Sequence, residues 1–464
     1  MTTTGRKPRI LLIGNIAQNG YLLTKFLRRA GWDAELLIYS YTHLMGQPEW
    51  EDAAIRGNPP HWDADWKDYL ADDYRRPEWV HEIRVKPHDW QRRLLVRLRL
   101  ARQFYCWRGH RLTRRRRSTL IARFQQRFGQ QRGPLLPGDI DYALAYCNYP
   151  GIPPALVRRF DLLIGTGLDA TLPMLLAPGK PYLALEHGTM RELPLEDSSW
   201  GRMLALAYDQ AAACIITNPD CIATAQKLGL PRCRFMPHPI DDKYLAPDPG
   251  RHCGLDPQCR EGDGPLVFAP ARHDWAIKGN QVAIDGFARF VASGVQKNAR
   301  LLLLEWGADL SRSRALIDQR GIADRVLWRP VLSGRSFCDA IKAADVVLDQ
   351  FVLGVFGSTV PQALAAGKPV VSSYDDAKNQ WAFPVPPPLC RAATADEVAG
   401  HLGQLFGDAE KRRQISIAAR AWFDRYHSPD RVVAILAEML ESAHASSPAR
   451  ADQRGKSALG ALAP

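Results

Sequence analysis

The chain has 464 residues, of which 46% are hydrophobic, and this composition is typical of a globular protein with a sizeable core. No apolar run approaches the roughly 18 residues of a membrane-spanning helix, and the apolar run near the N-terminus is too short for a secretory signal. We therefore expect a cytoplasmic protein built from two domains of about 200 residues each, with short tails.

The net charge of +12 is concentrated in one segment. Residues 91–132 contain 14 arginines and no aspartate, glutamate or lysine, so the remainder of the chain has a net charge of −2. Leucine and aromatic residues interleave with these arginines. This pattern predicts one or two basic helices with an apolar side.

Three interpretations of this basic segment remain open. The first is a solvated charged face, which the absence of balancing acids disfavours. The second is an RNA-binding arm. The third, which the leucine and aromatic content favours, is a helix lying on an anionic membrane surface. In that case the protein is peripheral at the inner face of the membrane.

The first half of the chain opens with an α/β pattern. Residues 8–14 and 33–40 are predicted strands, and residues 21–30 have the apolar spacing of a helix. The loop that contains Gly14 and Gly20 lacks the G-x-G-x-x-G spacing of dinucleotide-binding folds, so we do not expect NAD.

Five more strands are predicted in this half, after an irregular stretch (41–89) that we expect to cover the active face. The last two are 214–217 and 235–237, and the other three are DYALAYCN (141–148), FDLLIGTG (160–167) and PYLALEHG (181–188). Open α/β sheets bind ligands beyond the carboxyl ends of their strands, so His187 in the segment 181–188 is a candidate catalytic residue.

The second half repeats the alternation of apolar strands and helices, so each half is predicted to form a doubly wound parallel sheet. The predicted strands of the second half are 265–269, 300–305, 326–328, 346–348 and 370–372. The predicted domain division is an N-terminal domain (1–243, with the basic insert 91–132), a linker (244–264), a C-terminal domain (265–427), a last helix (428–445) and a disordered tail (446–464).

Two features of the second half predict a diphosphate site. Arg272 follows a predicted strand, and Lys278 and Gly279 stand at the start of the next helix, so two cations and a helix N-terminus come together. The turn 357–359 begins another helix and leaves backbone N–H groups available to an anion. The alternative interpretation is ordinary surface cations and a structural turn.

In these motifs and in their order along the chain, the second half resembles the nucleotide-sugar domain of retaining glycosyltransferases of family 4, which have GT-B architecture. This architecture consists of two Rossmann-like domains that face each other across a cleft. The first half resembles that family's acceptor domain less specifically. The segments that carry the resemblance are Arg272 with Lys278 and Gly279, LLLLEWGAD (301–309), VLWRPVL (326–332), ADVVLDQF (344–351) and FGSTVPQALAAGKPVV (356–371).

The resemblance implies roles for individual residues. Arg272 and Lys278 would bind the donor diphosphate, and His187 would contact the donor sugar from the first domain; these three are the expected catalytic residues. Backbone groups near the base would come from residues after the strand at 326–328. The expected donor-binding residues are Gly14, Gly279, Pro330, Val331, Leu332, Gly354, Phe356, Gly357, Ser358, Thr359 and Gln362.

The sequence departs from the family at two positions. The family commonly has two glutamates eight positions apart, one near the sugar and one on the ribose, where this chain has Gly354 and Gln362. Gln362 can still hydrogen-bond a hydroxyl, but as a neutral group. A lost charged hydrogen bond costs about 1.5–3 kcal/mol. Asp349 and Gln350 are candidates for compensating contacts.

We therefore expect a glycosyltransferase of hexosyltransferase type. It would move a sugar from a nucleotide-diphosphate sugar to a glycan or lipid-linked acceptor in cell-surface polysaccharide assembly, with retention implied by the resemblance. Nine scattered cysteines lack zinc-site spacing, so we expect reduced thiols, no metal and no cofactor. The alternatives are a nucleotide-sugar epimerase or hydrolase of the same fold, or a non-catalytic binding protein.

Overall fold

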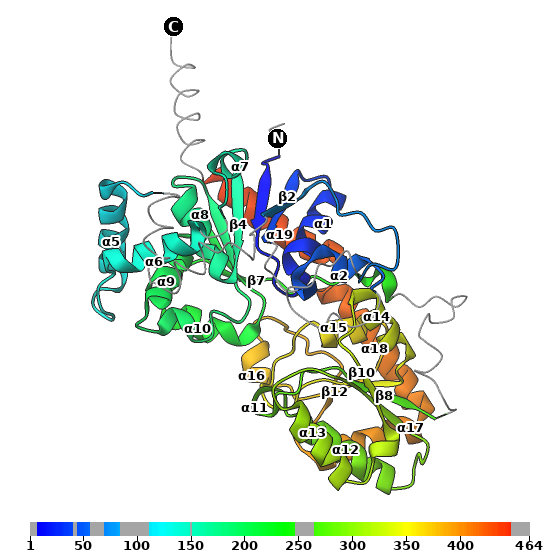
Figure 1. The fold of residues 1–464 in the computed structure, drawn as a ribbon. Coiled ribbons are helices and arrows are strands. Elements are labelled where there is room, and N and C mark those ends of the chain that lie inside the picture. Colours follow the sequence, from blue (N-terminus) through cyan, green and yellow to red (C-terminus); the bar gives the residue numbers. More distant parts are fainter. Residues whose placement is uncertain are drawn as a thin grey trace, which may run out of the picture. The chain divides into compact units, whose positions relative to one another are not determined.

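The computed structural model describes residues 7–39, 44–55, 69–83, 111–148, 151–245 and 264–446, and these residues form two compact units (Figure 1). Unit 1 takes its described residues from Met1–Gln47, Arg76–Met236 and Val433–Pro464. Unit 2 takes its described residues from Pro48–Arg75 and Pro237–Val432. Packing contacts thus assign Pro48–Arg75 to the second unit and most of the last helix to the first, which chain order alone does not indicate.

Unit 1 is organised around a seven-stranded sheet in which every neighbouring pair is parallel. Its strands are β1 (Ile10–Ile13), β2 (Ala34–Tyr39), β3 (Val80–Ile83), β4 (Leu162–Thr166), β5 (Tyr182–Leu185), β6 (Ala213–Ile216) and β7 (Cys233–Phe235), in the spatial order β3-β2-β1-β4-β5-β6-β7. Its helices are α1 (Asn19–Arg29), α5 (Arg114–Phe128), α6 (Pro137–Asn148), α7 (Pro154–Arg158), α8 (Thr171–Leu176), α9 (Ser199–Gln210), α10 (Ile222–Lys227) and most of α19 (Pro429–Ala445).

Unit 2 contains a six-stranded parallel sheet. Its strands are β8 (Leu266–Ala269), β9 (Arg300–Leu304), β10 (Val326–Arg329), β11 (Val346–Leu348), β12 (Val370–Ser372) and β13 (Cys390–Arg391), in the order β10-β9-β8-β11-β12-β13. Its helices are α2 (Pro48–Asp52), α11 (Trp275–Lys278), α12 (Asn280–Ala292), α13 (Leu310–Gln319), α14 (Gly334–Ala343), α15 (Thr359–Ala365), α16 (Asp376–Asn379), α17 (Ala395–Gly407) and α18 (Ala409–Tyr426).

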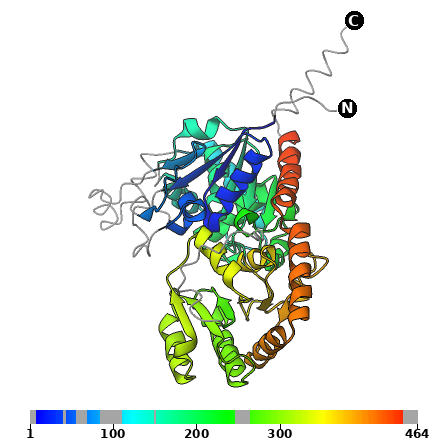
Figure 2. The same ribbon diagram turned by 90° about the vertical axis from the view of Figure 1, so that its right-hand side faces the viewer.

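The central strands of both sheets are mostly apolar because helices cover both faces. Every residue of β1, β4, β5, β8 and β11 is buried, whereas the edge strands β3, β7 and β10 are only partly buried. In unit 2, α12 and α17 lie side by side (Figures 1 and 2), and both contribute to one core with β8, β9 and β11.

Each sheet has one point at which the strand order changes direction. In unit 1 this point lies between β1 and β4, and in unit 2 it lies between β8 and β11. At such a point the connections leave the two neighbouring strands toward opposite faces, so a crevice opens beyond their carboxyl ends. The sequence-based prediction of two doubly wound parallel sheets is confirmed.

One predicted strand is wrong. Residues 141–148 lie in the helix α6 rather than in a strand. The buried residues of this helix are Ile140, Ala143, Leu144 and Cys147, and their spacing is helical. Pro137 stands at the helix start, where a missing N–H is tolerated, and Leu136 N donates to the Asp139 carboxylate at 2.9 Å.

Part of the predicted basic helix is confirmed. α5 buries Leu120, Phe124 and Phe128, which lie four residues apart on one side, and it begins at an N-cap, Thr113, that accepts from Arg116 N. Residues 91–110 of the basic segment lie outside the described residues. Most of the predicted linker, residues 246–263 with Cys253 and Cys259, also lies outside the described residues. The same is true of residues 447–464 of the predicted tail.

The strands β3 and β13 are absent from the sequence-based prediction. β3 lies in the stretch interpreted as irregular, and it pairs with β2 at the edge of the sheet. β13 has only two residues. Short edge strands carry a weak periodic signal because only part of each is buried. Among the described residues, no helix is long and apolar enough to cross a membrane.

Candidate functional site

The central feature of unit 2 is a contact between the loops that follow β8 and β11. Lys278 Nζ donates to Gln350 Oε1 at 2.8 Å, and Phe351 N donates to the Lys278 carbonyl at 2.9 Å. Both loops leave the carboxyl ends of neighbouring strands at the point where the strand order changes direction. The predicted cation therefore lies where parallel sheets bind ligands.

Gln350 is held firmly in this position. Its side chain is 2% exposed, and its amide Nε2 donates to the Val355 carbonyl. Its own carbonyl accepts from the Ser372 hydroxyl at 2.9 Å and from Ser373 N at 2.9 Å. The loop after β12 thus fixes the loop after β11, and the side-chain oxygen of Gln350 is aimed at Lys278.

Asp349, at the end of β11, is 7% exposed. Burial raises the pKa of this carboxyl, and the positive charge of Lys278 opposes the shift. Lys278 thus stands beside a neutral amide and a carboxyl that resists ionisation. A cation in these surroundings keeps attraction for a further anion.

Arg272 lies in the loop between β8 and α11, and its side chain is 45% exposed. Its guanidinium donates to the Asp274 carboxylate at 2.9 Å. The loop is anchored by Asn280, which donates to the Ala271 carbonyl at 3.2 Å and accepts from Asp274 N at 2.9 Å. An incoming phosphate would compete with Asp274 for this guanidinium, so Arg272 attracts an anion less strongly than an arginine without an acidic neighbour.

Gly279 directly precedes α12 and has no side-chain cap. Lys278 and Gly279 thus lie at a helix start, whereas the convergence of Arg272 with Lys278 stays a prediction. A Cβ at Gly279 would lie 3.1 Å from the Cβ of Phe351, which shows how closely the two loops approach.

Gly354 stands where the resembled family has its first glutamate. Its φ is +69°, and a Cβ would lie 2.8 Å from the Cβ of Asp375. Its carbonyl accepts from Asp375 N at 2.9 Å and from the Asn379 amide at 2.8 Å. This backbone excludes a side chain, so the departure from the family pattern is built into the loop.

The other donor residues expected in this loop differ in exposure. Phe356 is 3% exposed and packs against Phe383, with ring centroids 5.4 Å apart, so its side chain belongs to an aromatic core. Ser358 is exposed, and Gly357 and Thr359 are half-buried at the start of α15. Gln362 is half-buried, and its side chain makes no hydrogen bond within the part of the chain that the structure describes.

Pro330, Val331 and Leu332 follow β10 and are half-buried. β10 is the edge strand of the sheet, two strands away from β8. These residues therefore lie on the same carboxyl edge as Lys278. Whether their backbone meets a base stays a prediction.

In unit 1 the switch point brings Gly14, after β1, against Asp169, after β4. Gly14 has a φ of +90°, and a Cβ there would lie 2.5 Å from Asp169 Oδ2 and 2.3 Å from Thr166 Oγ1. Asp169 is buried, and its Oδ1 accepts from the Tyr146 hydroxyl at 3.0 Å and the Tyr39 hydroxyl at 3.5 Å. Burial raises the pKa of Asp169 to about 7, although both hydroxyls oppose the shift.

His187 lies after β5 on the same edge of the sheet and is half-buried. Its Nδ1 is 3.5 Å from the amide nitrogen of Asn19, the first residue of α1. The preceding residue, Glu186, is fully buried and accepts from Thr217 N at 2.8 Å and Asn218 N at 2.6 Å. Burial raises the pKa of Glu186, but hydrogen bonds from Asn218 and Gly188 outweigh it and lower the pKa overall.

The predicted residues thus fall into two groups, one on the carboxyl edge of each sheet. Gly14 and His187 lie in unit 1, and the other predicted residues lie in unit 2. Asp169 and Tyr146 are absent from the sequence-based prediction. Asp169 carries a usable signal, because it follows a buried strand and a glycine, whereas Tyr146 lies in the helix that was interpreted as a strand.

Within the described residues, no group of three or more histidine, cysteine or acidic side chains is arranged to hold a metal. Among the described residues, Cys214, Cys221, Cys233, Cys338 and Cys390 are free thiols.

Comparisons with known proteins show which solved structures share this fold. No model of a known protein family matches the sequence, and no curated protein matches it. Solved structures do match. HepE from Anabaena, solved in complex with UDP and glucose, is 13% identical with a TM-score of 0.59, and the match covers 94% of this chain and 100% of that one.

Two further structures match over nearly their whole length. Sucrose-phosphate synthase from Thermosynechococcus elongatus is 16% identical with a TM-score of 0.57, covering 95% of this chain and 100% of that one. A glycosyltransferase from Rickettsia africae is 12% identical with a TM-score of 0.57, covering 96% and 100%. The fold of this chain is that of GT-B glycosyltransferases. At these identities the likeness concerns the fold alone, because the chemistry of a protein depends on the residues of its site and not on its fold.

Proposed function

We propose that this GT-B chain is a glycosyltransferase that uses a nucleotide-diphosphate sugar as donor. The single observation that carries the proposal is the placement of Lys278 against Gln350 at the switch point of the second sheet. HepE, which shares the fold, was solved with UDP and glucose, and a nucleotide diphosphate is the ligand that such a cation suits.

In this reaction the bond between the sugar C1 and the donor phosphate oxygen breaks, and its electron pair stays on the diphosphate. The acceptor hydroxyl oxygen forms the new bond to C1, and its proton passes to the departing diphosphate. Negative charge grows on the departing diphosphate, so the ammonium of Lys278 stabilises the transition state more than the ground state. Arg272 would assist after release from Asp274.

The finer assignment is part of the same proposal. The enzyme would be a retaining hexosyltransferase, and its acceptor would be a glycan or lipid-linked saccharide in cell-surface polysaccharide assembly. His187 would contact the donor sugar from unit 1. The arginine-rich segment 91–132 would hold the protein at an anionic membrane surface, consistent with its 14 arginines and leucine content.

A non-catalytic binding protein is the second candidate, because Gly354 excludes the glutamate that the resembled family carries near the sugar. It would share the donor site but lack turnover. Measuring both donor binding and sugar transfer separates the two functions.

The test compares Lys278→Ala with a matched control, Lys297→Ala, which removes an exposed lysine elsewhere in unit 2. Nucleoside diphosphates and their sugar conjugates are titrated by calorimetry, and transfer is followed by donor consumption. We expect Lys278→Ala to weaken diphosphate binding about tenfold or more, because a charged hydrogen bond is lost, while the control binds like the wild type. Unchanged binding and turnover in Lys278→Ala would reject the proposal.

A further inference from the structure

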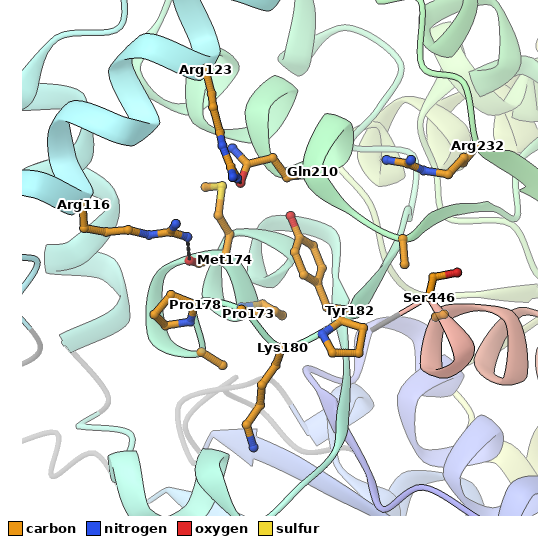
Figure 3. Close-up of a pocket in the computed structure, with 15 residues that line it drawn as sticks. Arg116, Arg123, Pro173, Met174, Pro178, Lys180, Tyr182, Gln210, Arg232 and Ser446 are labelled. Carbon is orange, nitrogen blue, oxygen red and sulfur yellow. Dashed lines mark hydrogen bonds between the residues drawn. The ribbon is translucent and has the colours of Figure 1, made fainter. Parts of the chain in front are cut away.

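Unit 1 contains a second candidate site, on the edge of its sheet opposite to His187. A cavity of about 370 Å³ opens there (Figure 3). Its lining includes Tyr182, the first residue of β5, Ala212, which precedes β6, and Arg232, which precedes β7. The cavity therefore lies at the amino ends of these strands, whereas Gly14, Asp169 and His187 lie at the carboxyl ends.

The lining of this cavity is strongly basic. It includes Arg116 and Arg123 from α5, Lys180 from the loop before β5, and Arg232, and none of the described residues that line it is acidic. The Lys180 ammonium is already engaged, because it donates to the Arg158 carbonyl at 2.8 Å and to the Phe160 carbonyl. Arg232 is held in the same way, because its Nη2 donates to the Ala211 carbonyl at 3.1 Å and to the Asp209 carbonyl at 3.3 Å. These carbonyls are neutral, so all four cations contribute to the positive charge of the lining.

Two buried donors in the wall have no acceptor within the described residues. They are Arg116 Nε and Gln210 Nε2. Arg116 Nη2 donates to the Met174 carbonyl at 3.3 Å, and Gln210 Oε1 accepts from Arg123 Nη1 at 3.0 Å, so both side chains are held in place (Figure 3). A buried donor without an acceptor is unfavourable, so these two N–H groups mark polar positions in the wall for which the described residues supply no acceptor.

The acidic residue next to Gln210 in the chain does not neutralise this cluster. Asp209 precedes Gln210 but pairs with Arg127 at 2.8 Å. Arg127 belongs to the same helix as Arg116 and Arg123. Burial, and then the charge of Arg123, lower the pKa of Arg116, so the lining holds positive charge that lacks a counter-ion among its own residues.

We infer that this cavity binds a phosphate group, carried either on a lipid headgroup or on a soluble phosphate ester. Arginine suits this ligand because its planar guanidinium presents several N–H groups that match phosphate oxygens in pairs. Arg116, Arg123 and Gln210 would be the contacting residues from one side, and Arg232 would close the other. The volume lies in the range of small-ligand sites, so the phosphate can carry a group of about glycerol size.

This site is independent of the proposed transfer reaction. It lies at the opposite edge of the sheet from the residues proposed to contact the donor sugar. Its residues also extend beyond the arginine-rich segment, since Gln210 and Arg232 come from other parts of the chain. A phosphate bound here would fix α5 against β5 and β7 and would thus locate the basic segment on the surface of unit 1.

The experiment uses the full chain with Lys278→Ala as the background, so that phosphate binding in unit 2 is weakened. The cavity variants are Arg116→Gln/Arg123→Gln and, on a different element, Arg232→Gln. The matched controls are Arg115→Gln for the single variant and Arg114→Gln/Arg115→Gln for the double variant, which remove the same number of charges from exposed positions on α5. Inorganic phosphate and glycerol 3-phosphate are titrated by calorimetry, and flotation is measured with phosphatidylcholine vesicles with and without phosphatidic acid.

We expect each cavity variant to lose about tenfold or more in affinity, while the matched controls stay within about twofold of the background. If the cavity variants lose binding only to the vesicles that contain phosphatidic acid, the ligand is a lipid headgroup. If they lose affinity for glycerol 3-phosphate, the ligand is a soluble phosphate ester. Thermal melting shows whether the double variant folds. If the double variant does not fold, Arg232→Gln provides the test of phosphate binding. The inference is overturned if neither probe binds, or if the controls lose as much as the cavity variants.

Discussion

The side chain of Gln350 accepts a 2.8 Å hydrogen bond from Lys278, although the two residues lie 72 positions apart in the chain. The contact joins the loops after β8 and β11, which are neighbours in the sheet. A neutral amide holds the ammonium without cancelling its charge. The predictions for unit 2 follow from this arrangement.

Replacing Gln350 with glutamate should weaken diphosphate binding. The new carboxylate would pair with Lys278 and reduce its attraction for a phosphate. We expect about a tenfold loss of UDP affinity in calorimetry. In the background of Lys278→Ala, the same substitution should cost little more, because the two changes act on one interaction. If the losses of UDP affinity in the two single variants add up in the double variant, Gln350 does not act through Lys278.

Replacing Gln362 with glutamate should strengthen donor binding. The substitution restores the charged acceptor that the resembled family places on the ribose, and a charged hydrogen bond contributes about 1.5–3 kcal/mol. We expect about a tenfold tighter UDP complex, with a smaller gain for the deoxyribose analogue. The control is Gln319→Glu at the exposed end of α13. An equal gain for both nucleotides would mean that Gln362 does not contact the ribose.

Replacing Gly354 with alanine should destabilise unit 2. The backbone at this position has a φ of +69°, and a Cβ would lie 2.8 Å from the Cβ of Asp375. The strain corresponds to about 1–3 kcal/mol. Gly357→Ala is the matched control, because a Cβ there meets no atom within 4 Å. Urea unfolding should separate the two variants, and equal stability would contradict the described loop geometry.

Asp169 should make the stability of unit 1 depend on pH. Its pKa is raised from an ordinary 3.8 to about 7 by burial, so the folded protein holds this proton more tightly than the unfolded chain. The resulting stabilisation is complete below about pH 4 and is lost as the pH rises through 7. Three pKa units correspond to about 4 kcal/mol, which is an upper bound.

The substitution Asp169→Asn should flatten this profile, because the amide stays neutral and can still accept from Tyr146. Unfolding is measured between pH 5 and 8, with Glu192→Gln, an exposed acid of unit 1, as the control. We expect the control to follow the wild type. A wild-type profile in Asp169→Asn would show that another group causes the pH dependence.

Most of the fold could be predicted because burial leaves a local signal. Strands such as β1, β8 and β11 are apolar throughout, and the helices between them show regular apolar spacing. The prediction failed at residues 141–148, where one helical face, with Ile140 and Leu144, was interpreted as a strand. The predicted strand covered only residues 141–148, so the helical period was not recognised, because the helix begins earlier, at Pro137.

The candidate site could be predicted only in part. Lys278 and Gly279 are adjacent in the sequence, and their position after an apolar strand marks them. Asp169 and Tyr146 come from separate elements, and only packing brings their side chains within 3.0 Å. The same holds for Arg116 and Arg232, which line one cavity from different parts of the chain.

The sequence by itself determined the succession of buried strands and helices, the location of the basic segment and the two cations of the second half. These properties depend on neighbouring residues, so they can be recognised along the chain. Only the tertiary structure decided which strand ends are neighbours. The order of strands in a sheet is set by the direction of each crossover, and for this reason Lys278 meets Gln350 while Gly14 meets Asp169.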